Sequence, residues 1–253
     1  MAVLTGRPQL STVDLYTSEL VKTTALGTLM DSQTGKYFRY CLNGAAALVK
    51  GNLLQEAAND VQFDALAVQT AGVIGDQYLT LTNGTTTITP FMFDDGTVFS
   101  NTAGAAVTVG DEYTIKSITG TLTSGGTIKV WTDRPLRYAY ATSATKVGLN
   151  KSPFGGVIQF PLTTQTGMPV GGAIYEIPAS TATVPVYGWI QTHGVFAGLS
   201  DNSTFAIGSG LVPSLAAAGA FGVNVAGTTH TPVGVARHAA ETTKCIPIFL
   251  NID

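Results

Sequence analysis

The sequence predicts an all-β protein built from small antiparallel barrel or sandwich units, with an extended N-terminal arm and crossing segments rich in Gly, Pro and Thr. Apolar residues alternate with threonines in short runs, which is the period of a half-buried strand. Gly-containing turn pairs separate these runs, and helical periodicity is nearly absent. With 253 residues, the chain is long enough for one large β domain or two small ones.

Shifts in composition divide the chain into four regions. Residues 1–34 carry scattered apolar residues without a period and are interpreted as an extended arm. Residues 35–60 supply the first strands of the core β domain, and residues 61–135 form a hairpin-rich β domain. Residues 136–253 contain crossing segments, rich in Gly, Pro and Thr, followed by short strands of a C-terminal β domain.

Three turn signals define the hairpin-rich region. The stretch "QYLTLTNGTTTIT" turns at Asn83-Gly84, the favoured pair for a two-residue hairpin. A second turn is expected at Asp94-Asp95-Gly96 and a third near Gly125-Gly126. After the third turn, Ile128 and Val130 return on one face. The spacing predicts a compact antiparallel unit.

The stretch "YGWIQTHG", residues 187–194, predicts a strand with aromatic anchors. Alternation places Tyr187, Trp189 and Gln191 on one face of it. We expect the two aromatic residues to anchor either the C-terminal core or a subunit contact. His193 is expected at the end of this strand, as a hydrogen-bonded turn residue beside Gly194.

Charge is scarce in this chain. Only 11% of the residues are charged, against roughly 25% in an average soluble domain. A free monomer normally covers its surface with charge, so the deficit favours a protein that buries much of its surface in an assembly. The net charge of −3 provides no basic footprint for direct nucleic-acid binding. No membrane-spanning segment and no secretory signal are expected.

The sequence predicts no enzyme, cofactor or metal site. His193, His230 and His238 lie apart, without the spacing of a metal motif. No GxSxG elbow or other recognised nucleophile motif occurs. Cys41 and Cys245 are too few for a disulfide framework and are interpreted as unpaired core residues.

The best local charge cluster is Asp133-Arg134-Pro135 together with Arg137. Two interpretations stay open: an intersubunit salt bridge, or the solvated end of a strand. The candidate packing or interface anchors of the chain are Tyr187, Trp189, Trp131, Arg134 and Arg137.

An ordered series of short segments resembles virion structural proteins of tailed bacteriophages, of the kind that decorate or cement the head. The segments, from residue 35 to the end, are "GKYFRYCLNGAAALVKGNLLQ", "GDEYTIKSI", "DRPLRYA", "SPFGGVIQFP", "YGWIQTHGVFAGL", "IGSGLVPS" and "IFLNID". The resemblance covers the chain from about residue 25 onward and rests on the order and spacing of these segments. By analogy, residues 61–135 look like an insertion between two parts of a β domain.

The resemblance implies a non-enzymatic protein on the capsid surface of the virion, made in the host cytoplasm. Its expected partners are the major capsid protein and further copies of itself, as a homotrimer. It implies no catalytic residue, no membrane and no direct contact with nucleic acid. The extended arm, residues 1–34, would pack against neighbours in the lattice.

Two other classes of function stay open. One is a tail-tube, baseplate or head-fibre component, although the chain has no heptads or repeats of a fibre shaft. The other is a carbohydrate-binding β-sandwich that uses Tyr187, Trp189 or Trp131 as a stacking platform. Exposed aromatic rings beside polar groups would favour this second alternative.

Overall fold

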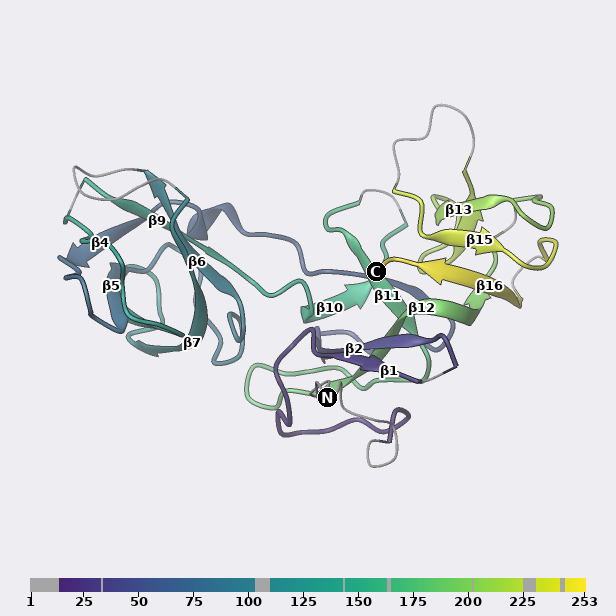
Figure 1. The fold of residues 1–253 in the computed structure, drawn as a ribbon, viewed down its shortest axis with the longest axis horizontal. Helices are drawn as coiled ribbons and strands as arrows, with labels where there is room; N and C mark the ends of the chain where they lie inside the picture. The colour runs from purple at the N-terminus through teal and green to yellow at the C-terminus, as the bar shows by residue number, and fades with distance from the viewer. Residues whose placement is uncertain are drawn as a thin grey trace, which may run out of the picture. The chain divides into compact units, whose positions relative to one another are not determined.

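The computed structural model describes residues 14–32, 34–102, 110–142, 144–162, 165–201, 203–224, 231–241 and 244–253. Within these ranges the regular structure is sixteen strands and one 3-10 turn, η1 (Val61–Phe63). The predicted all-β class is therefore confirmed. The chain forms two compact units: unit 1 comprises residues 1–57 and 156–253, and unit 2 comprises residues 58–155 (Figure 1).

Unit 2 is a closed antiparallel barrel with the strand order β4-β5-β8-β7-β6-β9. Because β9 pairs with β4, every strand has two neighbours and the barrel has no free edge. The strands are β4 (Leu66–Thr70), β5 (Tyr78–Thr82), β6 (Thr97–Thr102), β7 (Glu112–Gly120), β8 (Thr127–Thr132) and β9 (Lys146–Asn150).

Alternation along the barrel strands creates the core of unit 2. Leu79 pairs with Val130 and Leu81 pairs with Ile128, and all four side chains are fully buried. Burial of each such side chain contributes about 1.5–3 kcal/mol. Lys129, between Ile128 and Val130, is exposed as alternation predicts, whereas Thr80, between the two leucines, is itself buried.

Only one of the three predicted hairpin turns joins paired neighbouring strands. Gly125-Gly126 lies in the β7–β8 connection, and Gly120 pairs with Ile128 across it. The predictions at Asn83-Gly84 and Asp94-Asp95-Gly96 are wrong, because β5 and β6 are not neighbours in the barrel. The chain from 83 to 96 is instead a long connection whose Ile88 and Phe93 belong to the barrel core.

Asn83 links two connections of the barrel instead of forming a hairpin turn. Its side chain is buried, and its Nδ2 donates to the carbonyl oxygens of Thr86, Leu122 and Thr123 at 3.1, 2.9 and 3.1 Å. The amide therefore ties two connections together. Gly84 is needed for a different reason: a Cβ there would lie 2.4 Å from the carbonyl oxygen of Gln62.

Unit 1 contains a ten-stranded sheet with the order β1-β2-β10-β3-β11-β12-β16-β15-β13-β14. An additional pairing of β2 with β12 links the sheet back on itself. The strands are β1 (Leu29–Asp31), β2 (Tyr37–Asn43), β3 (Leu53–Gln55), β10 (Gly155–Gln159), β11 (Pro169–Ala173), β12 (Tyr187–Leu199), β13 (Gly210–Pro213), β14 (Phe221–Val223), β15 (Gly234–Ala236) and β16 (Cys245–Asn251).

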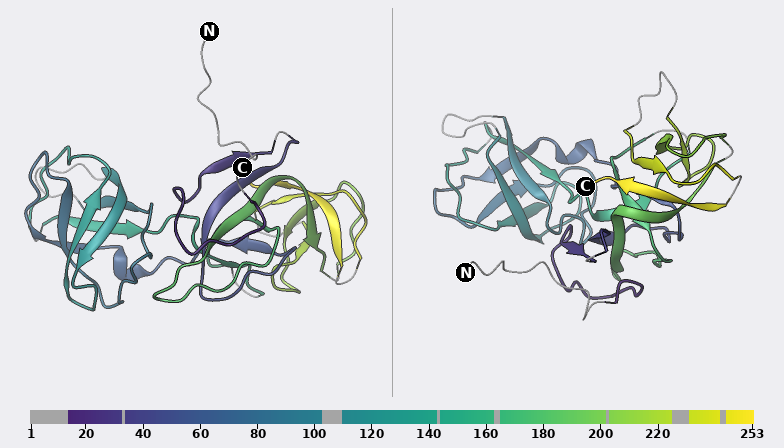
Figure 2. Two further views of the ribbon diagram at one scale, coloured as in Figure 1. Left: turned by 90° about the horizontal axis from the view of Figure 1, so that it is seen from below. Right: turned by 45° about the vertical axis from the view of Figure 1, so that its right-hand side comes forward.

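β12 pairs with three other strands of unit 1. Its first half pairs with β2 and β11, and its second half pairs with β16, beside which it runs in Figure 2. The β2–β12 register shifts between Gln191 and His193, so Thr192 is the extra residue of a bulge. The Gln191 Nε2 donates to the carbonyl oxygens of His193 and Val195, both at 2.9 Å, which satisfies polar groups beside the bulge.

The predicted place of His193 at a strand end is wrong, since β12 continues to Leu199. The His193 ring stacks on Tyr37 and meets the Phe249 ring edge-on, with centroids 5.0 Å away in both cases. Gly194, at φ 90°, permits the bulge. A Cβ at Gly194 would lie 2.5 Å from the carbonyl oxygen of Gly35.

The extended N-terminal arm predicted over residues 1–34 is not confirmed. Residues 1–13 lie outside the described ranges. Residues 14–32 pack on unit 1: Glu19 bridges to Tyr187, β1 pairs with β2, and the side chains of Leu15, Leu26 and Met30 are buried.

The regional boundary predicted near residue 135 falls inside unit 2. The barrel needs β9 for closure, so this unit extends to residue 155. Gly148 in β9 pairs with Phe99 of β6, and a Cβ on it would lie 2.3 Å from the Phe99 ring. Because packing against Phe99 requires a glycine at position 148, the sequence of β9 resembles that of a loop.

Candidate functional site

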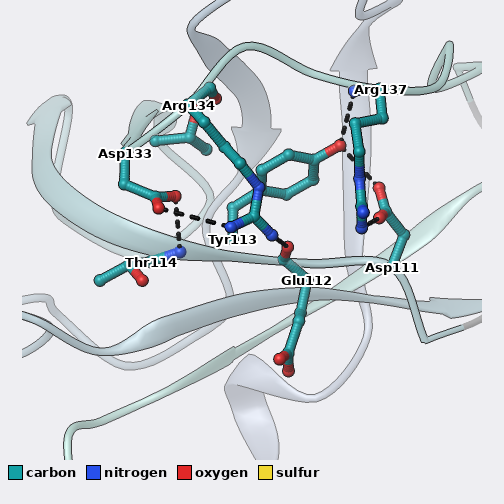
Figure 3. A network of polar contacts seen from close by, with 8 residues as sticks. Asp111, Glu112, Tyr113, Thr114, Asp133, Arg134 and Arg137 are labelled. Carbon is teal, nitrogen blue, oxygen red and sulfur yellow. Dashed lines mark hydrogen bonds and ion pairs between the residues drawn. The ribbon is translucent and has the colours of Figure 1, made fainter.

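A polar network joins the start of β7 to the segment that follows β8 (Figure 3). Its centre is Asp111, whose side chain is almost fully buried. Tyr113 donates its hydroxyl hydrogen to Asp111 Oδ2 at 2.7 Å, and Tyr140 donates to the same oxygen at 3.2 Å. Arg137 forms an ion pair with Asp111 Oδ1. Three donors therefore compensate the desolvation of one buried carboxylate.

Two arginines lie over the Tyr113 ring. The guanidinium carbon of Arg134 is 5.1 Å from the ring centroid, and that of Arg137 is 5.9 Å from it. Arg134 donates from Nη2 to the Glu112 carbonyl oxygen at 2.6 Å, while the Glu112 carboxylate points away in Figure 3. These contacts fix both guanidinium groups although their side chains are 46% and 55% exposed. Exposed arginines held in one orientation are suited to binding.

Tyr113, Tyr140 and Arg137 keep their usual charge states around neutral pH. Burial raises the pKa of Tyr113, although the backbone N–H of Arg137, which donates to the Tyr113 hydroxyl, acts in the opposite direction. Burial also raises the pKa of Tyr140. The hydrogen bond to Asp111 raises the pKa of Arg137 further above its usual range. The phenols stay neutral and the guanidinium stays charged, so proton transfer by these groups is disfavoured.

The segment that carries Arg137 is bonded to a second segment with exposed apolar side chains. Residues 72–76 and 136–140 run antiparallel, with hydrogen bonds between Gly72 and Tyr140 and between residues 75–76 and Leu136. Val73 and Ile74 in the first segment are 61% and 66% exposed, and Tyr138 in the second is 38% exposed. We call Val73, Ile74, Arg134, Arg137 and Tyr138 the arginine–apolar patch. It lies where β5 and β7 begin and β8 ends.

The side chain of Asp76 caps the turn that carries Val73 and Ile74. Asp76 Oδ2 accepts a hydrogen bond from the Val73 N–H at 2.8 Å, and the Asp76 N–H donates to the Val73 carbonyl oxygen at 3.0 Å. Both apolar side chains are therefore presented by an ordered turn. Little conformational entropy would be lost when such a surface binds.

Tyr187 and Trp189 lie inside unit 1. The Tyr187 ring stacks on Tyr40 at 5.7 Å, and the Trp189 ring packs on Tyr40 at 5.2 Å. Their exposures are 1% and 3%. In this arrangement neither is available for stacking on a sugar or for contact with another subunit.

Trp131 is partly exposed on the outer face of the barrel. Its ring packs against Tyr78 of the neighbouring strand at 5.0 Å, and its Nε1 donates to Thr119 Oγ1 at 3.2 Å. Lys129 Nζ lies 4.8 Å from the centroid of the Tyr78 ring. An aromatic pair beside a hydroxyl and an ammonium group can contact a polar ligand.

Of the three histidines, two lie in the described ranges, in different surroundings. His230 lies outside the described ranges, His193 is partly buried between the rings of Tyr37 and Phe249, and His238 contacts Glu241 at 3.8 Å. Across the described ranges, no group of three or more His, Cys, Asp or Glu side chains could hold a metal ion. Both cysteines are free; Cys41 is buried, but Cys245 is exposed, so its predicted core position is wrong.

Unit 1 also carries a surface hollow of about 510 Å³. Its floor includes Phe38 and Phe196, and Lys36, Lys50 and Gln191 are among its polar lining residues. Among its described lining residues there is neither a carboxylate nor an imidazole. The described lining thus offers aromatic rings, two ammonium groups and a side-chain amide.

Sequence reasoning identified Arg134 and Arg137 but missed the residues that position and surround them. Asp111 and Tyr113 belong to "GDEYTI", where alternation alone does not show that the carboxylate is buried. A usable signal was present in "AGVIGD": Val73 and Ile74 lie between two glycines and are followed by Asp76, a pattern typical of a capped turn.

Comparison with known proteins gives no assignment. No protein-family model matches the chain. Neither a curated protein nor a solved structure shows significant similarity to it. Among the described residues, no helix has the length and apolar character needed to cross a membrane.

Proposed function

We propose that this chain is a non-enzymatic virion structural protein that binds the capsid lattice and stabilises the head as a decoration, or cement, protein. One observation carries the proposal: a chain with only 11% charged residues also exposes large apolar side chains on both units. Among the described residues, those at least 60% exposed are Tyr16, Leu20, Val21, Val61, Val73, Ile74, Met168 and Ile207.

Such a surface suits a protein that functions in an assembly. Single exposed apolar residues are ordinary on monomers, but they become contact points where the surrounding surface has few charges. Burial of apolar surface contributes about 25 cal/mol per Å² and needs no charged hot spot. Contacts repeated over a lattice add avidity. The proposed partners are the major capsid protein and further copies of this chain, as a homotrimer.

The architecture is compatible with a role in which rigidity matters more than chemistry. A barrel without free edges resists strand-to-strand aggregation and presents side chains from fixed positions. The arginine–apolar patch and the hollow in unit 1 are both suited to binding. A tail-tube or baseplate component would use the same properties, and the test below separates it from a head protein.

The test measures the mass of the purified chain in solution and then its binding to expanded, undecorated capsids. A decoration protein is expected to bind as a trimer, at a fixed ratio to the lattice joints, and to raise the capsid melting temperature. Stacked rings or tubes, without capsid binding, would instead assign the chain to the tail.

A carbohydrate-binding role has one observation in its favour, the pair formed by Trp131 and Tyr78 on the outside of the barrel. Aromatic rings beside Thr119 and Lys129 can stack on a sugar ring and donate hydrogen bonds to its hydroxyls. A sugar-array screen with the wild-type chain and a Trp131→Ala variant tests it. Binding that the variant loses would support this role.

A further inference from the structure

The surface hollow in unit 1 has the chemistry of a ligand site. We propose that it binds the end of a peptide chain: a free C-terminal carboxylate on a residue with an apolar side chain. The carboxylate meets the ammonium groups of Lys36 and Lys50, the apolar side chain covers Phe38 and Phe196, and the last peptide N–H donates to the Gln191 side chain. The inference goes beyond the proposed virion role and does not depend on it.

Gln191 supplies a hydrogen-bond acceptor of fixed orientation. Its side chain is buried, and its Nε2 donates to the carbonyl oxygens of His193 and Val195, both at 2.9 Å. Because both of these groups are acceptors, the nitrogen has to face them, and Oε1 is the remaining atom of the amide. Within the described part of the chain, Oε1 accepts no hydrogen bond. Oε1 is not sealed from solvent, so a ligand N–H can reach it through the hollow that Gln191 lines.

Lys36 and Lys50 give the hollow positive charge. Among the described residues, neither ammonium group has an ion-pair partner, and the described lining holds no carboxylate. Asp14 and Asp31 are sequence neighbours of lining residues, but neither of them lines the hollow. The two ammonium groups are therefore available to an anion, and a carboxylate can accept hydrogen bonds from both.

The backbone beneath the two lysines is fixed by hydrogen bonds. The Lys36 N–H donates to Ser32 Oγ at 3.2 Å, and the Ser32 N–H donates to the Lys36 carbonyl oxygen at 3.0 Å. Beside Lys50, the Gly51 N–H donates to the Ala173 carbonyl oxygen of β11 at 2.8 Å. Both charges are thus carried by ordered segments, which lowers the entropy cost of binding.

The floor of the hollow is apolar and adjoins the free acceptor. Phe38 is the cross-strand partner of Gln191 in the β2–β12 pairing, and cross-strand partners lie on the same face of a sheet. Phe196 lies farther along β12 and lines the same hollow. The volume of about 510 Å³ falls in the usual range of ligand sites, roughly 300–1,000 Å³. A small hydrated anion would leave this floor uncovered, whereas an apolar C-terminal residue covers it.

Matched peptides test the three contacts without altering the protein. N-acetyl-phenylalanyl-leucine carries all three groups, its C-terminal amide lacks the negative charge, and its ester analogue lacks the last peptide N–H. Each is titrated into the isotope-labelled full-length chain and followed by NMR, with the Gln191 side-chain amide signal as the local reporter. We expect the free acid to bind at least about tenfold more tightly than the amide and roughly fivefold more tightly than the ester.

Lys36→Gln and Lys50→Gln remove the two charges one at a time. Each should weaken binding of the free acid roughly threefold and leave binding of the amide unchanged, and the double variant should bind both peptides equally. Lys116→Gln is the matched control, since Lys116 is an exposed lysine of β7 in unit 2, and it should bind like the wild type. Thermal unfolding shows whether the variants are folded, and Lys50→Gln alone carries the test if Lys36→Gln melts early.

Four results would overturn the inference, and each leaves the proposed virion role untouched. Wild-type protein that binds the acid and the amide equally, or neither of them at millimolar concentration, would remove the carboxylate site. Equal weakening by Lys116→Gln and Lys50→Gln would show an unspecific charge effect. Displacement of the peptide by an equal concentration of inorganic phosphate would indicate a site for small anions. Equally tight binding of an amidated peptide with an aspartate side chain would replace chain ends by acidic side chains.

Discussion

Arg39 and Asp253 lie 214 positions apart in the chain and form a two-point ion pair in unit 1. Arg39 Nε and Nη2 donate to the Asp253 carboxylate at 3.1 and 2.9 Å, and Arg39 Nη1 donates to the Gly27 carbonyl oxygen at 2.7 Å. One guanidinium group therefore connects three distant segments of the chain. The side chains of Arg39 and Asp253 are only 28% and 23% exposed, so solvent screens this ion pair incompletely.

The Arg39–Asp253 pair should make unit 1 less stable in acid. Burial raises the pKa of Asp253, but the hydrogen bonds from Arg39 and Thr192 and the charge of Arg39 outweigh it, and the net shift is downward from 3.8. A lowered folded pKa means that the stabilisation is present above about pH 4 and disappears as the pH falls through the folded value. Asp253→Asn should cost roughly 1 kcal/mol at pH 7. Urea unfolding at pH 7 and pH 3 measures both effects; an equal cost at the two pH values would contradict the assignment.

Trp189→Ala should strongly destabilise unit 1. The Trp189 side chain is 3% exposed and packs on Tyr40 of the neighbouring strand, so its removal leaves a cavity beside the Tyr40 ring. Truncations of this kind cost about 3–5 kcal/mol. Thermal unfolding followed by near-ultraviolet circular dichroism checks the result. Trp131→Ala, at a partly exposed position on the barrel, is the control and should cost clearly less.

Gly194→Ala should be poorly tolerated, whereas Gly35→Ala should cost only backbone strain. Both glycines have a positive φ, at 90° and 77°. A Cβ at Gly194 would lie 2.5 Å from a carbonyl oxygen, but a Cβ at Gly35 would have no atom within 4 Å. We expect about 1–2 kcal/mol for Gly35→Ala and more for Gly194→Ala. Equal losses in chemical denaturation would mean that the bulge in β12 relaxes around the new methyl group.

Arg137→Ala should destabilise the barrel more than Arg134→Ala does. Removal of Arg137 leaves the buried Asp111 carboxylate with only two tyrosine hydroxyls as donors, at a cost of about 1–3 kcal/mol. Arg134 contacts a carbonyl and the exposed side of Asp133, so its loss should cost less than about 1 kcal/mol. Denaturant unfolding of the two variants decides between them. The reverse order would show that Asp111 does not depend on Arg137.

The two cysteines should differ sharply in reactivity. Burial raises the pKa of Cys41 to about 12, although a backbone hydrogen bond with Gly188 opposes the shift, while Cys245 is exposed. Because the thiolate is the reactive species, a thiol reagent at pH 8 should modify one cysteine in the folded chain and two in urea. Cys245→Ser should abolish the folded-state reaction. Modification of Cys41 in folded Cys245→Ser would show that unit 1 opens under these conditions.

Local pattern was sufficient for the class of fold because alternation records which face of a strand is buried. Leu79, Leu81, Ile128 and Val130 follow that rule, and the structure places all four in the barrel core. The Gly125-Gly126 turn was also predictable, since its strands are consecutive in the chain and paired with each other.

Pairing between distant segments lay beyond any local pattern. Asn83-Gly84 has the composition of a hairpin turn, yet β5 pairs with β4 and β8, and the Asn83 amide binds carbonyls about forty positions away. The burial of Asp111 under Arg137 likewise depends on the approach of β7 to the segment after β8. A single sequence states the preferences of neighbouring residues; the closure of the barrel decides which distant groups meet.

The sequence by itself determined the all-β class, the scarcity of charge and the presence of Arg134 and Arg137 in one short segment. Only the tertiary structure decided that Tyr187 and Trp189 are core residues, and that the two arginines share the Tyr113 ring. The physical reason is that burial and orientation depend on contacts between strands far apart in the chain, which periodicity along one strand does not encode.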